Sequence, residues 1–464
     1  MSSKVTADSS CDREIEVGKP KYLASQGLKA LGIHLTHLVL GPLGFLPMKL
    51  GKNLCRNMFF RWCKVYFMYE LPDWAWVVLT VVAVYYSESI ETLLNLIIGT
   101  GCVIFIRTTL VSLKYGYYSK YFWEQMKNEF IDPQVTIKNF LLASWVNVSK
   151  EVADKEIVLE LKKLKAENMI LKLRKELCPS GITTCVPAVH ASKLIVSKLP
   201  KTKSKLDFWS IKAFSVFYAL NPFLLEIYKS GYSFELNSIY IVYSVVSALV
   251  AFIHCDAILR FLLTGTYDFR RKKLLMDECS ALITADSVLE GVLDLEDSST
   301  VQSWYFLRRA FLDFGRKFTL RIFLYFSLIL PLCIFIILLL ILQIFNVVGN
   351  DLNIYFASCF LLLLGVFIVL LKTSLEAVKI NEYFGVHRDI LLQMVSLKVR
   401  QHLLNLESIQ NFYGNVNFLI RKLEEDEILR PEKILGITIN SEFMSKLLAA
   451  GLSGLFAFFQ QLLR

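Results

Sequence analysis

The chain alternates long apolar runs with segments that are rich in charged residues. Six of the apolar runs form three pairs, each joined by a short polar connection, and a seventh closes the chain. Each run has at least the roughly 17 residues that a helix needs to cross a hydrocarbon layer. The pattern therefore predicts seven transmembrane helices, at residues 65–86, 90–113, 208–228, 237–263, 318–348, 352–371 and 447–463.

Composition agrees with this pattern. Of the 464 residues, 55% are hydrophobic, and the mean hydropathy is +0.47, which is too apolar for a soluble domain. The first 20 residues lack the basic, apolar and small-residue blocks of a secretory signal, and the cysteines form no Cys-x-x-Cys pair typical of zinc sites. We expect an all-α polytopic membrane protein of the plasma membrane, with no metal and no cofactor.

Basic residues predict the orientation. Lysine and arginine are abundant in the segments 114–207 and 264–317, whereas the short connections on the opposite side hold only Lys229. The N-terminus is therefore expected in the cytosol and the C-terminus outside, which is the reverse of a G-protein-coupled receptor. The net charge of +10 indicates a cytosolic face beside anionic membrane lipid and requires no nucleic acid.

The charged segments are expected to be helical as well. The helical pattern of the sixth span continues past Lys372 through 374–427 with a break near 411–414, and it is too polar to lie in lipid. Residues 151–177 show either a short coiled-coil seam or an amphipathic helix against the membrane or its neighbours. The expected regions are a cytosolic N-terminus with an interfacial helix (1–64), a six-helix bundle (65–371), cytosolic anchor-like helices (372–440) and a terminal pore-type helix (441–464).

Two short stretches resemble the insect odorant and gustatory receptor superfamily. The last span of that family carries Thr-Tyr, five hydrophobic residues and Gln-Phe; this chain has Ser453-Gly454, five apolar residues and Gln460-Gln461. The preceding tail, Pro431-x-x-Ile434-x-Gly436-Ile-Thr-Ile-Asn440-Ser-Glu-Phe443, is similar too, and Gly44-Phe-Leu-Pro47 looks like a motif before the first span of gustatory receptors. The tyrosine and phenylalanine of the signature are replaced here by Gly454 and Gln461. The chain resembles a divergent gustatory-receptor-like member.

The resemblance implies a tetrameric, ligand-gated cation channel, built from identical or different subunits, whose pore is lined by the last helix of each subunit. Independently, helical spacing places small and polar residues on one stripe of that helix, which suits a water-filled path that an apolar ring closes by dewetting. The same small residues also suit close helix packing, and both readings stay open. The predicted pore residues are Ala450, Ser453, Phe456, Ala457, Gln460 and Arg464.

A small-molecule ligand of unknown identity is implied in the outer half of the bundle. Aromatic and hydroxyl side chains at that depth suit a partly apolar molecule, although a tyrosine there also serves as an interfacial anchor. The candidate ligand-binding residues are Asn95, Asn221, Tyr240, Tyr243, Tyr355 and Ser358. Among the intramembrane charges, Asp256 and Arg260 have the spacing of an ion pair within one helix, and His254 is expected to be structural.

The sequence carries no catalytic signature: no Gly-rich phosphate loop, no His-Glu-x-x-His and no Gly-x-Ser-x-Gly. We therefore expect no enzymatic activity. The alternatives are a non-conducting membrane scaffold, a subunit that depends on a co-receptor, a small-solute transporter, or a protein of this topology in an intracellular membrane.

Overall fold

The computed structural model describes most of the chain from residue 71 onward. The described ranges are 71–86, 90–114, 150–174, 183–200, 204–230, 238–284, 292–314, 353–401, 406–434 and 437–462, with the single positions Leu289, Leu338 and Leu342. The fold is mostly helical, and the predicted run 318–348 lies outside these ranges apart from two positions. Residues 1–64 also lie outside them.

Six helices coincide with predicted spans. They are α4 (Leu71–Tyr86), α5 (Ile90–Lys114), α10 (Lys205–Ser230), α11 (Ser238–Thr284), α14 (Asn353–Gln401) and α16 (Ser441–Leu462). Two of them, α11 and the part of α14 at Ser358–Leu397, are long and apolar enough to cross a membrane, and shorter apolar helices lie at Leu71–Tyr86 and Leu96–Arg107.

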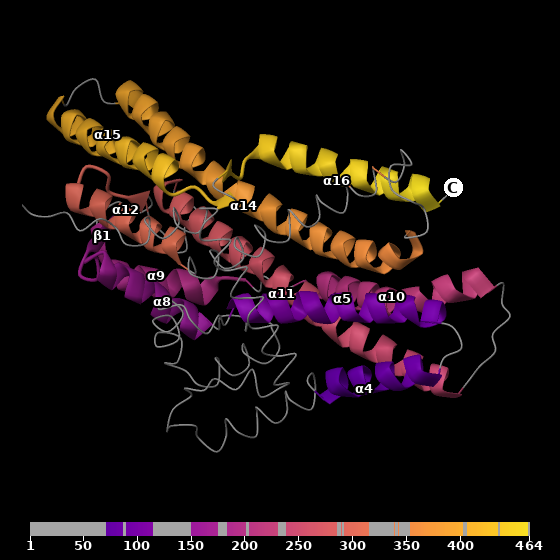
Figure 1. The fold of residues 1–464 in the computed structure, drawn as a ribbon. Helices are drawn as coiled ribbons and strands as arrows, with labels where there is room; N and C mark the ends of the chain where they lie inside the picture. The colour runs from indigo at the N-terminus through magenta and orange to yellow at the C-terminus, as the bar shows by residue number, and fades with distance from the viewer. Residues whose placement is uncertain are drawn as a thin grey trace, which may run out of the picture.

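The two longest helices, α11 and α14, lie side by side and run in the same direction (Figure 1). Each has an apolar first half and continues without interruption into a charged second half. Hydrogen bonds between them follow the same order along both sequences, which establishes the parallel register. The bonded pairs are Thr266 with Thr373, Arg270 with Glu376, and Asp277 with Tyr383.

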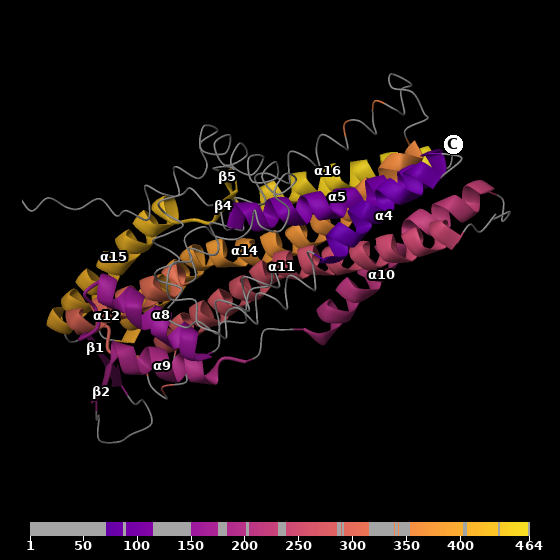
Figure 2. The ribbon, with the colours of Figure 1, turned by 60° about the horizontal axis from the view of Figure 1, so that its bottom comes forward.

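A folded module surrounds the charged halves of α11 and α14 (Figures 1 and 2). It contains an antiparallel sheet in the order β2-β1-β3, in which Ile170 of β1 pairs with Pro187 of β2. The elements are α8 (Lys150–Lys163), β1 (Ile170–Arg174), β2 (Thr183–Pro187), α9 (Ala188–Lys198), β3 (Val292–Leu293), α12 (Ser298–Asp313) and α15 (Leu406–Leu429).

The sheet corrects the all-α expectation and the single helix proposed for 151–177. The helix α8 ends at Lys163, and Lys165 adopts a positive φ of 55° that turns the chain. Leu171 and Leu173 both point to the core, because alternate side chains of a strand lie on the same face. The backbone of β1 is hydrogen-bonded to β2 and β3. Leu171 is therefore a core residue in a strand, although its spacing from Leu164 and Leu161 also fits a coiled-coil heptad.

The break expected at 411–414 is wrong. The helix α15 continues through this segment, and a side-chain carbon at Gly414 would meet nothing within 4 Å. An isolated glycine costs only about 1 kcal/mol relative to alanine in a helix interior, and packing of α15 on α12 and α14 offsets this.

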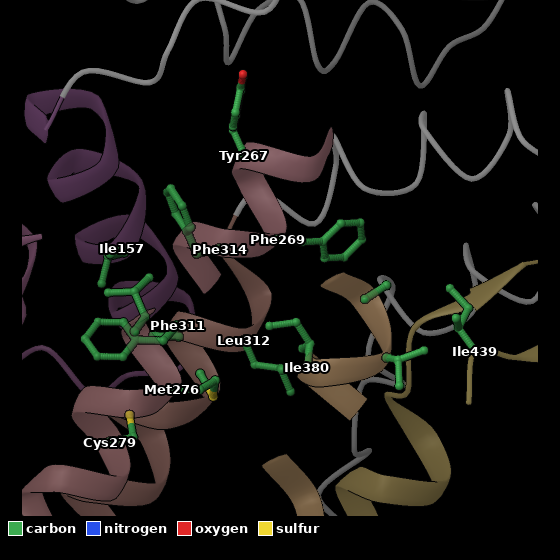
Figure 3. Packing of buried hydrophobic residues seen from close by; sticks show 14 of the residues in the cluster. Ile157, Tyr267, Phe269, Met276, Cys279, Phe311, Leu312, Phe314, Ile380 and Ile439 are labelled. Atoms are coloured by element: carbon green, nitrogen blue, oxygen red, sulfur yellow. The ribbon is translucent and has the colours of Figure 1, made fainter. Parts of the chain in front are cut away.

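One hydrophobic core connects the module to the bundle. Figure 3 shows side chains from α8, α11, α12 and α14 meeting there, among them Ile157, Met276, Phe311 and Ile380, all fully buried. A smaller cluster lies between α4, α5 and α11 and contains Trp76 and Tyr243. The continuous core fixes the module to the α11–α14 pair.

Candidate functional site: the terminal helix and the polar seams of the bundle

The terminal helix α16 lies along α14 at one edge of the molecule, as Figures 1 and 2 both show. Its contact face is made of Met444, Gly451 and Gly454, which are buried. A side-chain carbon added at Gly451 would stand 2.5 Å from ring atoms of Phe367 on α14. Gly451 therefore allows the two helices to approach closely, as small residues do in membrane helix pairs.

The opposite face of α16 is exposed. Ala450 and Ser453 are exposed, Phe456 is 71% exposed, and Gln460 is partly exposed. The hydroxyl of Ser453 donates to the carbonyl of Ala449 at 2.9 Å, so it is satisfied within its own helix. Of these small residues, Gly454 is buried, whereas Ala450 and Ser453 are exposed.

The structure adds Ala449, which is also exposed, to this face. The predicted stripe does not include Ala449, although it lies one turn before Ser453 on the exposed side. The side chains of Ala457 and Arg464 lie outside the described part of the chain.

The direction of α16 is opposite to that of α14. Ile439, before α16, meets Asn381 through its carbonyl at 2.9 Å, while Gly451 lies beside Phe367. The helix thus starts beside the charged part of α14 and ends beside its apolar part, and the last described residues lie at the end of the bundle where α14 begins (Figure 1).

A small hairpin, β4 (Lys433–Ile434) and β5 (Ile437–Thr438), leads into α16 and is bound to both long helices. Asn381 of α14 donates to the carbonyls of Glu432 and Ile439 and accepts from the amide of Glu432 at 2.8 Å. Lys272 of α11 donates to the carboxylate of Glu432 at 2.9 Å, and both side chains are buried. This anchor leaves no local pattern in the sequence, because its partners lie 51 and 160 positions apart.

Two of the predicted ligand residues form one polar contact. The amide of Asn221 on α10 donates to the hydroxyl of Ser358 on α14 at 3.1 Å. Nearby, the hydroxyl of Tyr218 donates to the carbonyl of Gly99 at 2.7 Å, and a side-chain carbon at Gly99 would lie 3.2 Å from Ser358. These groups join α5, α10 and α14.

Another predicted residue, Tyr243, belongs to a different seam, between α4 and α11. Its hydroxyl accepts from Thr80 at 3.2 Å, and one turn away the indole of Trp76 donates to Ser247 at 3.0 Å. Tyr240 is partly buried against the same hydrophobic cluster. The polar pairs hold the antiparallel helices α4 and α11 together.

The six predicted ligand residues therefore do not converge on one site among the described side chains. Asn221 with Ser358 and Tyr240 with Tyr243 belong to two separate helix contacts. Asn95 and Tyr355 lie in α5 and α14, with side chains outside the described part. In this arrangement the described hydroxyls and amides bind each other and serve helix packing.

A buried charged group continues the α4–α11 seam. His254 Nε2 lies 2.5 Å from Asp73 Oδ1, and an Arg107 Nη1 lies 3.9 Å from Asp73 Oδ2. All three residues are at most 8% exposed. Asp256 accepts from Arg260 at 2.9 Å, which confirms the ion pair predicted within one helix.

The module contains its own buried network around Arg308, which is fully buried on α12. Arg308 donates to His387 Nδ1 at 3.0 Å and to Asp426 at 3.3 Å, and Tyr305 also donates to Asp426. Burial lowers the pKa of Arg308, against the pull of Asp426. Burial, together with Asp426, raises the pKa of Tyr305 to about 12. The network ties α12, α14 and α15 together and matches no catalytic arrangement.

No group of three His, Cys, Asp or Glu side chains among the described residues is placed to hold a metal ion. The candidate site is the exposed face of α16, with its apolar and hydroxyl side chains. The hairpin before this helix is held by the Lys272–Glu432 ion pair. Comparison with family models, with curated proteins and with solved structures finds no match to this chain.

Proposed function

We propose that this chain is a multi-pass membrane protein that forms a ligand-gated cation channel of the chemosensory-receptor type, with α16 of each subunit lining the pore. The observation that carries the proposal is the two-sided character of α16. One face packs on α14 at Gly451, and the other exposes Ser453 and Phe456 fully and Gln460 in part.

Exposed apolar faces support placement in a bilayer. Hydrophobic side chains that point outward cover α4, α10 and α11, and such surfaces are costly in water and suited to lipid. They include Val78, Val81, Val216, Phe217, Leu220, Val242, Val245 and Leu249.

The register of the helices supports an odd number of crossings. Since α11 and α14 are parallel, the chain has to return between them, and the apolar run 318–348 lies in that interval. The helices α4 and α16 run opposite to α11 and α14 respectively. These directions agree with seven spans and with chain ends on opposite sides of the bilayer; the cytosolic side of the N-terminus is proposed from the basic residues of 114–207 and 264–317.

In the proposed tetramer, the exposed faces of four α16 helices meet around the pore axis. Four copies of α16 around an axis would surround a path with small and hydroxyl-bearing positions, and the ring of Phe456 would close it by excluding water. The ring is large and exposed, whereas the exposed ring of Phe217 lies on another helix, α10.

The test is basal whole-cell current from cells that express the full chain, Phe456→Ala or Phe217→Ala, the second being the same substitution on the outward face of α10. We expect Phe456→Ala to raise basal cation current severalfold, because a methyl group no longer excludes water from the constriction. Phe217→Ala should leave the current unchanged. Identical currents from both variants, at equal surface labelling, would contradict a pore lined by this face.

A further inference from the structure

Two large aromatic side chains stand exposed where α10 begins. Phe208 and Trp209 are 40% and 66% exposed, and their rings meet edge to face with centroids 5.5 Å apart. The outward face of α10 beyond them is apolar, with Val216, Phe217, Leu220 and Leu224. Aromatic rings that end an apolar stripe are typical of the level of lipid headgroups.

Cationic groups gather on this aromatic pair. The guanidinium carbon of Arg260 lies 4.4 Å from the ring centre of Phe208, and the ammonium of Lys212 lies 5.4 Å from it. Lys205, the first residue of α10, is exposed beside them. Asp256 binds Nε of Arg260 at 2.9 Å and so offsets one of the three positive charges.

Asp207, the other acidic residue near this surface, is neutralised by cations of the bundle interior. Asp207 is buried, and its carboxylate accepts from Lys372 and lies 3.6 Å from Arg270. These cations come from α14 and α11, so the outward-facing Lys205 and Lys212 are not used to neutralise Asp207. The surface keeps a net positive charge next to an apolar helix face.

We propose that Lys205, Lys212 and Arg260, arranged around Phe208 and Trp209, bind the phosphate headgroup of an anionic phospholipid. The acyl chains would lie along the apolar face of α10, which a soluble anion cannot use. Lysine and arginine beside an anionic leaflet each add attraction for such lipids, and guanidinium binds phosphate through paired donors. The inference rests on the placement of α10 and α11 across a bilayer and is independent of conduction.

The test is native mass spectrometry of the full chain, purified from nanodiscs of phosphatidylcholine mixed with phosphatidylserine. We expect retained phosphatidylserine on the unaltered chain and roughly a fivefold loss for each cation removed in Lys212→Gln/Arg260→Gln. Lys193→Gln/Lys198→Gln, two exposed lysines on α9, is the charge-matched control and should retain the lipid.

Removing Arg260 also leaves Asp256 without its ion-pair partner, so a second variant that keeps Arg260 is needed. Lys205→Gln/Lys212→Gln leaves that ion pair intact and should also lose the lipid. The proposal is overturned by equal retention in all variants, by equal loss in the α9 control, by no preference over phosphatidylcholine, or by release of the lipid with inorganic phosphate. Each readout is independent of ionic current, so failure here leaves the pore proposal untouched.

Discussion

At the scale of single residues, Gly451 decides how closely α16 approaches α14. Any side-chain carbon there would lie 2.5 Å from the ring of Phe367, closer than atoms tolerate. We predict that Gly451→Ala lowers stability by about 1–3 kcal/mol, since the ring has to move. The measurement is thermal unfolding of the detergent-solubilised chain.

The matched variants use the neighbouring positions. Ala450→Leu, on the exposed side, should change stability by no more than about 0.5 kcal/mol. Adding Phe367→Leu to Gly451→Ala should restore part of the loss. A full loss in the double variant would show that the clash lies elsewhere.

Asp297 caps α12 and gives a prediction for pH. Its carboxylate accepts from the amide and hydroxyl of Thr300, at 3.0 and 2.8 Å. Partial burial works against ionisation, but the bonds from Ser299, Thr300 and Lys172 lower the pKa of Asp297 from 3.8 to about 2. Because the folded pKa is depressed, this stabilisation is complete above the unfolded pKa and is lost as the pH falls through about 2.

We therefore expect Asp297→Ala to cost about 1 kcal/mol at neutral pH, as lost N-caps do. The difference in melting temperature from the unaltered chain should shrink between pH 4 and pH 2, roughly where this carboxylate binds its proton. A difference that stays constant to the lowest pH would contradict the capping role.

At the scale of elements, the hairpin before α16 depends on one buried ion pair. Removing one partner of such a pair costs about 3–5 kcal/mol, because the other charge stays buried, whereas an apolar replacement of both is often neutral. We predict a large loss of stability in Lys272→Met and in Glu432→Met, and recovery in the double variant, measured by thermal unfolding. A double variant as unstable as either single one would assign the loss to other contacts of these residues.

At the scale of the whole molecule, the directions of the helices predict opposite sides for the module and the C-terminus. Cys185 is exposed on β2 of the module. We expect a membrane-impermeant thiol reagent to label it only after permeabilisation, with Cys185→Ser as the background, and an epitope after Arg464 to be detected on intact cells. Detection of both on the same side would overturn the topology.

The sequence by itself determined where the long apolar helices lie. Six of the apolar runs contain helices, because a long apolar run between polar segments is a signal that needs no knowledge of distant contacts. The pairing of Asp256 with Arg260 was also predictable, because i and i+4 positions are neighbours on any helix.

Only the tertiary structure decided which faces meet. The spacing of Leu171 fits a heptad, yet pairing with β2 places it in a strand; Gly451 and Ala450 are both small, yet only the first touches Phe367. Contacts such as Asn221 with Ser358 and Lys272 with Glu432 join positions 137 and 160 residues apart. Local pattern predicts the long apolar helices, whereas the strand pairing of Leu171 and the partner of each buried polar group depend on how distant segments pack.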